Sequence, residues 1–280
     1  MPIHDQGYRR YGGDRVPNGR AWLVIAAAGI RTFITRRAFL GLLLLSWIQF
    51  FGRVGQIYLS ANLPQVPALV AVTAETFREF LEAQGLFVFL ITVYVGSGLI
   101  ANDRRANALQ IYLSKPLGRA EYVAGKFAVL MTFLLLVTWV PGLLLLIIQA
   151  LFAGNFTFLV DNVYLFPAIT LVSFIESATA AASMLALSSL SNSSRYVGIL
   201  YTALLFFSQA LFNVLRFVTG GSTIAWVSFQ ANLDQVGRAI FRQPLQYETP
   251  WLVSLLIVAG VIGVSGLVLE RRVRGVEIVA

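Results

Sequence analysis

The chain alternates long apolar stretches with short charged ones. An apolar stretch of about 18 or more residues can cross the ~30 Å hydrocarbon core of a bilayer as a helix. The pattern therefore predicts an all-α membrane protein with six transmembrane helices. The expected spans lie at about 38–59, 83–102, 127–152, 165–190, 196–217 and 250–269.

Three shorter helices are expected beside these spans. Residues 20–37 have an apolar run, 21–30, that is too short to span, which predicts an interfacial helix. The face that Arg78 shares with three glutamates in 75–82 predicts a short helix on the outer surface. Charges at every fourth position of 234–242 predict one amphipathic helix in an outer vestibule.

Basic residues determine the expected orientation. With a cytosolic N-terminus, only five of the 21 Lys and Arg residues fall outside the cytosol: Arg53, Arg78, Arg216, Arg238 and Arg242. This asymmetry predicts that both termini are cytosolic. We expect a flexible cytosolic tail at 1–19, one membrane domain over 20–274 and a second cytosolic tail at 275–280.

Composition excludes several classes of protein. Hydrophobic residues make up 58% of the chain and charged residues 12%, against about 25% charged in soluble domains. The net charge of +8 comes from basic runs next to the spans, so we expect contact with membrane lipid and no nucleic acid. With no cysteine and His4 as the one histidine, we expect no metal site and no catalytic triad.

The most informative stretch joins the second and third spans. It has an acidic and basic cluster at the end of one span and then a short segment with Leu109 and Leu113 on one helical face. Pro116 ends that segment, and a Tyr and a Lys lead into the next span. The residues of this series are Asp103, Arg104, Arg105, Leu109, Leu113, Ser114, Lys115, Pro116, Arg119, Tyr122 and Lys126.

This series, together with the six-span layout, resembles the type-2 ABC transporter permease family, whose members are membrane subunits of bacterial exporters. The resemblance covers nearly all of the chain after Arg20. It implies that the loop 103–126 is a coupling helix that sits in a groove of a separate ABC-type ATPase. It also implies a bacterial inner-membrane location and a homodimer, or a heterodimer with a similar permease.

Nucleotide chemistry is expected in the partner. No Gly-x-x-x-x-Gly-Lys-(Ser/Thr) loop occurs in the sequence, so this chain lacks the usual phosphate-binding loop. We therefore expect a transport subunit that is not itself an enzyme and has no cofactor, with ATP and Mg bound by the partner ATPase.

Glu176 is the one charged residue expected in the middle of a span. An ionised carboxylate there is costly, which makes Glu176 a functional candidate in a translocation path. A structural role is equally open, with Ser173, Ser177 and Thr179 as hydrogen-bond partners. Two small-residue patterns, 177–183 and the glycines at 260, 263 and 266, favour close helix packing, within the chain or at a dimer interface.

Two other functions remain open from the sequence. A transporter driven by an ion gradient would use Glu176 as its ion or proton site, and would be expected to show broken helices and an internal repeat. A membrane anchor that recruits an ATPase without moving a substrate would use the same cytosolic loop. The sequence does not identify a substrate.

Overall fold

The computed structural model describes residues 21–62, 71–108, 118–153 and 157–273. Within these ranges the chain forms helices and no strands, which confirms the all-α prediction. Six helical stretches are long and apolar enough to cross a membrane, as predicted. They are Arg37–Asn62, Ala74–Arg105, Arg119–Phe152, Leu165–Leu190, Ser194–Thr219 and Trp251–Arg272. The chain is therefore a multi-pass membrane protein.

Several of these stretches consist of more than one helix. The helical elements in chain order are α1 (Ala21–Ile34), α2 (Arg37–Ser46), α3 (Ile48–Asn62), α4 (Ala74–Ile91), a π-helical turn (Thr92–Gly96), α5 (Ala101–Arg105), α7 (Arg119–Val137), α8 (Trp139–Phe152), α9 (Thr157–Asp161), α10 (Leu165–Leu190), α11 (Ser194–Thr219), a 3₁₀ turn (Ala225–Val227), α12 (Phe229–Ile240) and α13 (Trp251–Arg272).

Local chemistry explains two of the breaks. The first stretch is interrupted at Trp47, and the carbonyl of Ser46 at the break accepts a 3.1 Å hydrogen bond from buried Gln84 Nε2. In the third, α7 ends and α8 begins around Thr138, three residues before Pro141. Proline lacks a backbone donor and clashes with the preceding turn, so the helix is interrupted there.

The second stretch differs from the sequence prediction. The separate surface helix expected at 75–82 is wrong, because these residues are the first turns of α4, which is continuous from Ala74 to Ile91. Phe77, Phe80 and Leu81 are buried in the core, and Arg78 is buried as well. Apolar packing and a charged partner for Arg78 therefore extend the helix toward its N-terminus.

Helix α10 is the central element of the bundle. Its segment 177–183, rich in Ala and Ser, is largely buried, and the helix packs against α4, α7, α8, α11, α12 and α13. Small side chains let neighbouring helices approach closely. The predicted packing role of this segment is confirmed within the chain. The three glycines of α13 do not lie at a close contact with another helix of this chain. A Cβ at 260, 263 or 266 would meet no atom within 4 Å.

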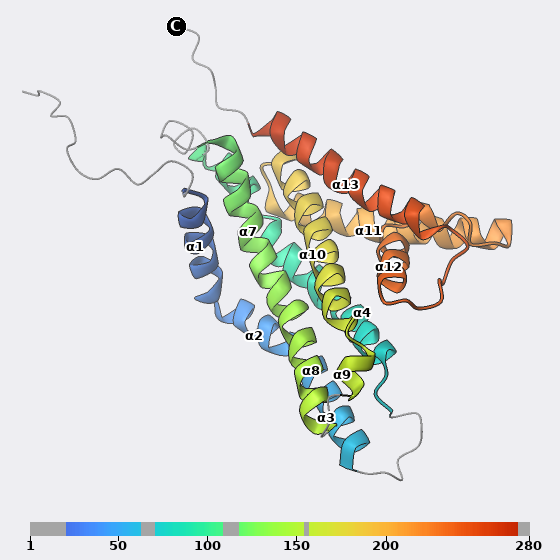
Figure 1. Cartoon of the computed structure of the whole chain (residues 1–280). Helices are drawn as coiled ribbons and strands as arrows, with labels where there is room; N and C mark the ends of the chain where they lie inside the picture. The colour runs from blue at the N-terminus through green and yellow to red at the C-terminus, as the bar shows by residue number, and fades with distance from the viewer. Residues whose placement is uncertain (1–20, 63–70, 109–117, 154–156, 274–280) are drawn as a thin grey trace, which may run out of the picture.

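Helix α1 packs lengthwise against α7 (Figure 1). A Cβ on Gly125 of α7 would lie 2.7 Å from Ile25 Cβ and 2.9 Å from the Trp22 carbonyl oxygen. Glycine at this position therefore permits the close approach of the two helices. The interfacial position expected for residues 20–37 stays a prediction.

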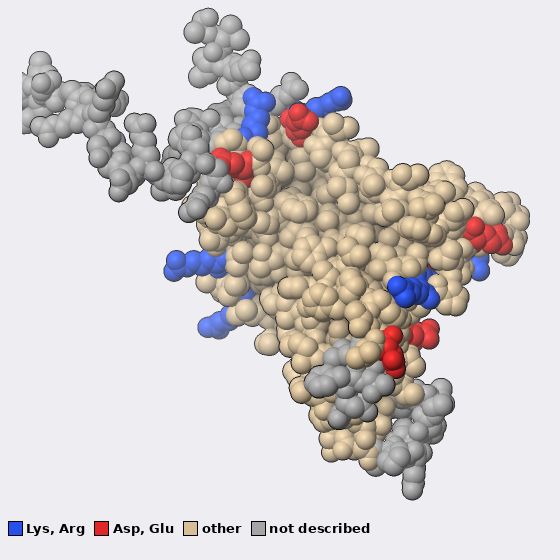
Figure 2. Space-filling view, in the orientation of Figure 1, with Lys and Arg blue, Asp and Glu red and all other residues tan. Residues whose placement is uncertain are grey.

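The helices form two arms. In Figure 1, α3, α8 and the start of α4 extend toward the bottom of the view, while α11 and α13 extend to the right. Helix α12 contacts α10, α11 and α13 at the junction. On the face seen in Figure 2, charged side chains gather at the upper and left edges, at the tip of the right arm and in the notch between the arms. A broad uncharged surface lies between these groups, as a bilayer requires.

Candidate functional site

Two charged clusters lie in the described part of the chain, and the first joins the second and third spans. Asp103, on the short helix α5, accepts a 2.7 Å hydrogen bond from the Tyr122 hydroxyl. The same oxygen, Oδ2, lies 2.7 Å from Lys126 Nζ. Tyr122 and Lys126 are one turn apart on α7, and the ammonium group of Lys126 lies 5.5 Å from the Tyr122 ring centroid.

These three residues form a joint at the base of the loop between α5 and α7, which we call the loop joint (Asp103, Tyr122, Lys126). Tyr122 is fully buried, and the side chains of Asp103 and Lys126 are largely buried. A charge-assisted hydrogen bond with both partners shielded from water is stronger than an exposed one. The joint therefore ties the end of one span to the start of the next.

The start of α7 is further stabilised by Glu121. Its Oε2 accepts a 3.1 Å hydrogen bond from the backbone N–H of Gly118, just before the first helical residue. A carboxylate in the first turn also interacts favourably with the positive end of the helix dipole. The chain thus enters α7 in a defined direction, which positions Tyr122 and Lys126 toward Asp103.

The structure brings together Asp103, Tyr122 and Lys126, three of the residues predicted for ATPase coupling. Three other arginines of the series do not join them. Arg105 and Arg119 are exposed, and Arg104 is partly buried with its Nη1 atom unpaired within the described chain. The remaining predicted coupling residues lie outside the described residues: Leu109, Leu113, Ser114, Lys115 and Pro116. The coupling helix itself therefore stays a prediction.

The second cluster connects α4, α10 and α12 and centres on Arg78. Its Nη1 atom donates to Glu176 Oε1 at 3.3 Å, and its Nη2 atom donates to Asp234 Oδ1 at 2.7 Å. Asp234 Oδ2 also accepts from Arg238 Nε at 3.0 Å, one turn along α12. We call these four residues the buried charge cluster.

The charged side chains of this cluster are largely buried, so each needs an oppositely charged partner. Arg78 is 3% exposed, and each of the two carboxylate side chains is 15% exposed. Desolvation of a charge costs several kcal/mol unless a counter-ion and hydrogen bonds offset it. Two arginines and two carboxylates pair within the cluster, which thereby links three helices.

A glycine makes room for the central arginine. A Cβ on Gly237 of α12 would lie 2.8 Å from Arg78 Cζ, closer than real Cβ atoms approach. The guanidinium group therefore lies directly against the backbone of α12. This close contact and the ion pair with Asp234 together attach α12 to α4.

The partner of Glu176 differs from the expected ones. Ser173 Oγ and Ser177 Oγ have no hydrogen-bond partner in the described chain, and Thr179 donates to its own helix at Ile175 O. The expected hydroxyl network is absent there, and Arg78 takes its place. The sequence gives one reason to expect a basic partner for Glu176: ionisable residues inside a span usually pair with one another.

The buried charge cluster borders a cavity of about 360 Å³ between α4, α10, α11 and α12. Glu82, Gln209 and Tyr247 line the same cavity. Burial, together with the nearby Asp234 carboxylate, raises the pKa of the Tyr247 hydroxyl above its ordinary value. This cavity presents a mixed polar and apolar surface beside α12.

The described parts of the chain hold no group of three or more His, Cys, Asp or Glu side chains that would suit a metal ion. No protein-family model matches the chain, and no curated protein matches its sequence. The functional assignment therefore depends on the residues of this chain alone.

Proposed function

We propose that the chain is the membrane-spanning subunit of an ATP-driven ABC exporter, coupled to a separate ABC-type ATPase through the cytosolic loop. The loop joint is the observation that carries the proposal. Because Asp103 ties α5 to Tyr122 and Lys126 on α7, a push on the loop between them is transmitted to two spans at once. A loop that only set topology would need no such joint.

The same proposal specifies the assembly. The partner binds ATP and Mg, and the exporter contains two membrane subunits, either two copies of this chain or this chain and a similar permease. The assembly lies in a bacterial inner membrane with both termini of the chain in the cytosol. The positive-inside pattern of Lys and Arg supports this orientation.

Purification of the chain from its native membrane in mild detergent tests the proposal. A stoichiometric partner with its own phosphate-binding loop, and ATP hydrolysis by the complex, are the expected results. A chain that copurifies with no ATPase and shows no hydrolysis would contradict the proposal.

A double variant tests the loop itself. Leu109→Asp with Leu113→Asp should release the ATPase, because two charges replace the apolar docking face, while the chain stays in the membrane. Leu245→Asp is the matched control, since Leu245 is 43% exposed between α12 and α13 and should leave the complex intact. Copurification yield is the measurement. An unchanged complex in the double variant would overturn the coupling assignment.

A second candidate, a transporter driven by an ion gradient, is favoured by the buried charge cluster. Arg78, Glu176 and Asp234 form the kind of intramembrane charge pairing that proton and ion carriers use. Transport assays in proteoliposomes separate the two functions. ATP-dependent transport that survives a proton uncoupler supports the exporter, and transport abolished by the uncoupler without any need for ATP supports the carrier.

A further inference from the structure

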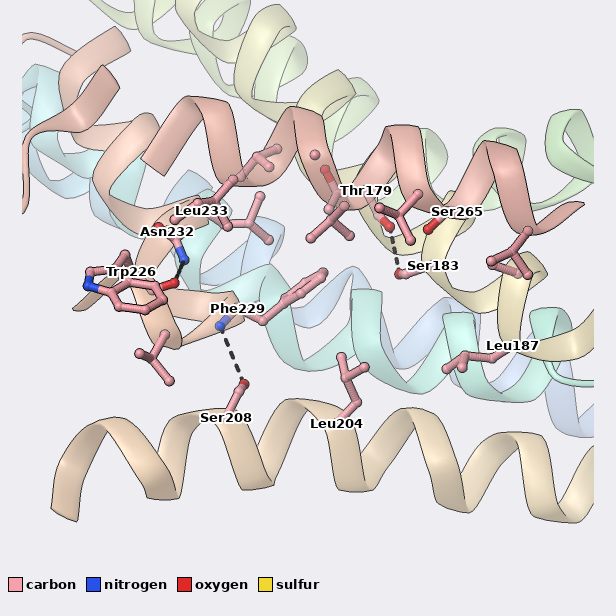
Figure 3. A pocket seen from close by; sticks show the side chains of 18 of the residues that line it. Thr179, Ser183, Leu187, Leu204, Ser208, Trp226, Phe229, Asn232, Leu233 and Ser265 are labelled. Carbon is pink, nitrogen blue, oxygen red and sulfur yellow. Dashed lines mark hydrogen bonds between the residues drawn. The ribbon is translucent and has the colours of Figure 1, made fainter. Parts of the chain in front are cut away.

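Three cavities along the described chain differ in the charge of their walls. The cavity enclosed by α10, α11, α12 and α13 has a volume of about 550 Å³, and no charged side chain is among the described residues that line it (Figure 3). The cavity beside the buried charge cluster is lined by three carboxylates and one arginine. The charged residues that line a third cavity, of about 490 Å³, are Arg36, Lys126 and Asp103. Of these three cavities, only the third therefore has an excess of positive charge.

This third cavity is a groove along α1, which we call the α1 groove. Its walls come from α1, from the segment 94–103, from Lys126 on α7 and from Ser194 at the start of α11. The volume falls within the roughly 300–1,000 Å³ range of small-molecule sites.

The two basic residues lie at opposite ends of the α1 groove. Lys126 lies beside the start of α1, because a Cβ on the neighbouring Gly125 would be 2.7 Å from Ile25 Cβ. Arg36 lies at the far end, where its Cζ atom is 5.0 Å from the Phe33 ring centroid. About 12 Å of helix axis separates Ile25 from Phe33.

Arg36 keeps an unpaired positive charge. Asp103 is paired with Lys126 at the other end of the groove, and none of the ion pairs within the described ranges involves Arg36. Arg36 is exposed, and its side chain does not cap the helix α2 that begins at the next residue. A guanidinium group that is accessible and unpaired can donate two parallel hydrogen bonds to a phosphate.

Neutral polar side chains also line the α1 groove. Asn102 is exposed, and Ser97 and Ser194 are half-buried. The side chains of these three residues make no hydrogen bond to other described parts of the chain. They can therefore donate to the oxygen atoms of a bound headgroup.

An exposed apolar stripe begins next to Arg36. The backbone N–H of Leu40 donates to Arg36 O at 3.0 Å, so Leu40 and Leu44 lie on the same helical face as Arg36. Leu40 is 40% exposed and Leu44 is 74% exposed. A soluble phosphate ester would leave this stripe uncovered, whereas a phospholipid would cover it with an acyl chain.

We propose that the α1 groove binds the headgroup of an anionic phospholipid, with the phosphate on Arg36 and one acyl chain on Leu40 and Leu44. Basic pockets between membrane helices are typical sites for such headgroups. A choline headgroup would add a second cation beside Arg36, and the one acid among the described lining residues, Asp103, is already paired with Lys126. This site goes beyond the proposed ATPase coupling and does not depend on it.

Native mass spectrometry of the purified full-length chain measures this binding. The paired probes are phosphatidylglycerol and phosphatidylcholine with identical acyl chains. We expect phosphatidylglycerol to bind about fivefold more tightly, the effect of one basic residue near an anionic headgroup. Arg36→Gln should remove this preference. Arg37→Gln is the matched control and should keep it, because Arg37 is also exposed but does not line the groove.

A second pair of variants tests the location. Ala28 lines the groove and its neighbour Ala27 does not, although both are exposed. Ala28→Phe should therefore fill the groove and remove the preference for phosphatidylglycerol. Ala27→Phe places the same side chain outside the groove and should keep the preference.

Four results would overturn the proposal. Equal affinities of the two lipids for the unmodified chain would exclude an anionic headgroup site. A preference that is lost equally in Arg37→Gln would assign it to the general positive charge of this surface, and one that survives Ala28→Phe would place the lipid elsewhere. Glycerol phosphate that competes as well as the lipid at equal concentration would assign the groove to a soluble phosphate ester. If Ala28→Phe does not fold, the arginine pair still decides the proposal.

Discussion

Arg78 is a basic residue buried in a membrane helix, and two carboxylates balance its charge. Glu176 lies 3.3 Å from one guanidinium nitrogen and Asp234 lies 2.7 Å from the other. The arginine therefore holds α10 and α12 against α4. Its removal would leave Glu176 without a cation and Asp234 with Arg238 alone. An uncompensated buried carboxylate is costly, so we expect this loss to destabilise the chain more than the loss of either acid.

Thermal unfolding in detergent should rank three variants at this cluster. Arg78→Met should destabilise the chain by about 3–5 kcal/mol, as expected when one partner of a buried ion pair is removed. Glu176→Gln should cost about 1–3 kcal/mol, because Asp234 still pairs with Arg78. Arg53→Gln is the control: it breaks the Arg53–Glu79 pair, in which Glu79 is 51% exposed, and should cost less than about 1 kcal/mol.

The same Glu176 variant separates two roles. Loss of transport with normal stability would place Glu176 in the translocation path, and loss of stability would assign it to packing. Equal unfolding temperatures for Arg78→Met and Arg53→Gln would contradict the structural role of the buried charge cluster.

At the scale of elements, the breaks and joints of the long helices determine how the spans move together. The loop joint ties α5 to α7, and the break around Thr138 separates α7 from α8. We therefore expect a displacement of the loop to reach α7 before α8.

Asp103→Asn should uncouple the two subunits without separating them. An amide cannot form the ion pair with Lys126, so the joint loosens while the loop surface stays the same. We expect transport to fall about tenfold with normal copurification of the ATPase. Asp161→Asn, at the exposed end of α9, is the control and should transport normally. Full transport in Asp103→Asn would show that the joint is not part of the coupling.

The contact between α1 and α7 gives a second prediction at this scale. Gly125→Leu should destabilise the chain by about 1–3 kcal/mol, because the new side chain overlaps Ile25 and the Trp22 carbonyl. Gly41→Leu is the matched control, since a Cβ there meets no atom within 4 Å. Thermal unfolding of both variants is the measurement. Equal unfolding temperatures would mean that α1 does not pack on α7 in the membrane.

For the whole molecule, the notch between the two arms and the distribution of charge agree with one orientation. Helix α12 lies at the junction of the arms (Figure 1). Basic residues dominate the proposed cytosolic segments. The vestibule would then open on the side opposite the ATPase, as an exporter requires.

Site-directed labelling tests this orientation, and the absence of native cysteine simplifies it. Gln246→Cys, exposed between α12 and α13, should react with a membrane-impermeant maleimide from outside the cell. Gly12→Cys and Glu277→Cys should react only in inside-out vesicles. The opposite pattern would reverse the proposed topology and remove the loop from the side on which an ATPase is found.

The amino-acid sequence determined the membrane class, the number of spans and the residues of the loop joint. Apolar length is a local property, so six spans can be counted without knowledge of packing. Tyr122 and Lys126 share a helical face by their spacing, and Asp103 precedes them across a short loop. The contacts among these three residues therefore depend mainly on local helix geometry.

Only the tertiary structure decided the buried charge cluster and the cavity beside it. Arg78, Glu176 and Asp234 lie far apart in the sequence and on three different helices. The angle at which those helices cross determines whether the charges meet. Local periodicity predicts which face of a helix is apolar, whereas helix packing determines which polar atoms find a partner.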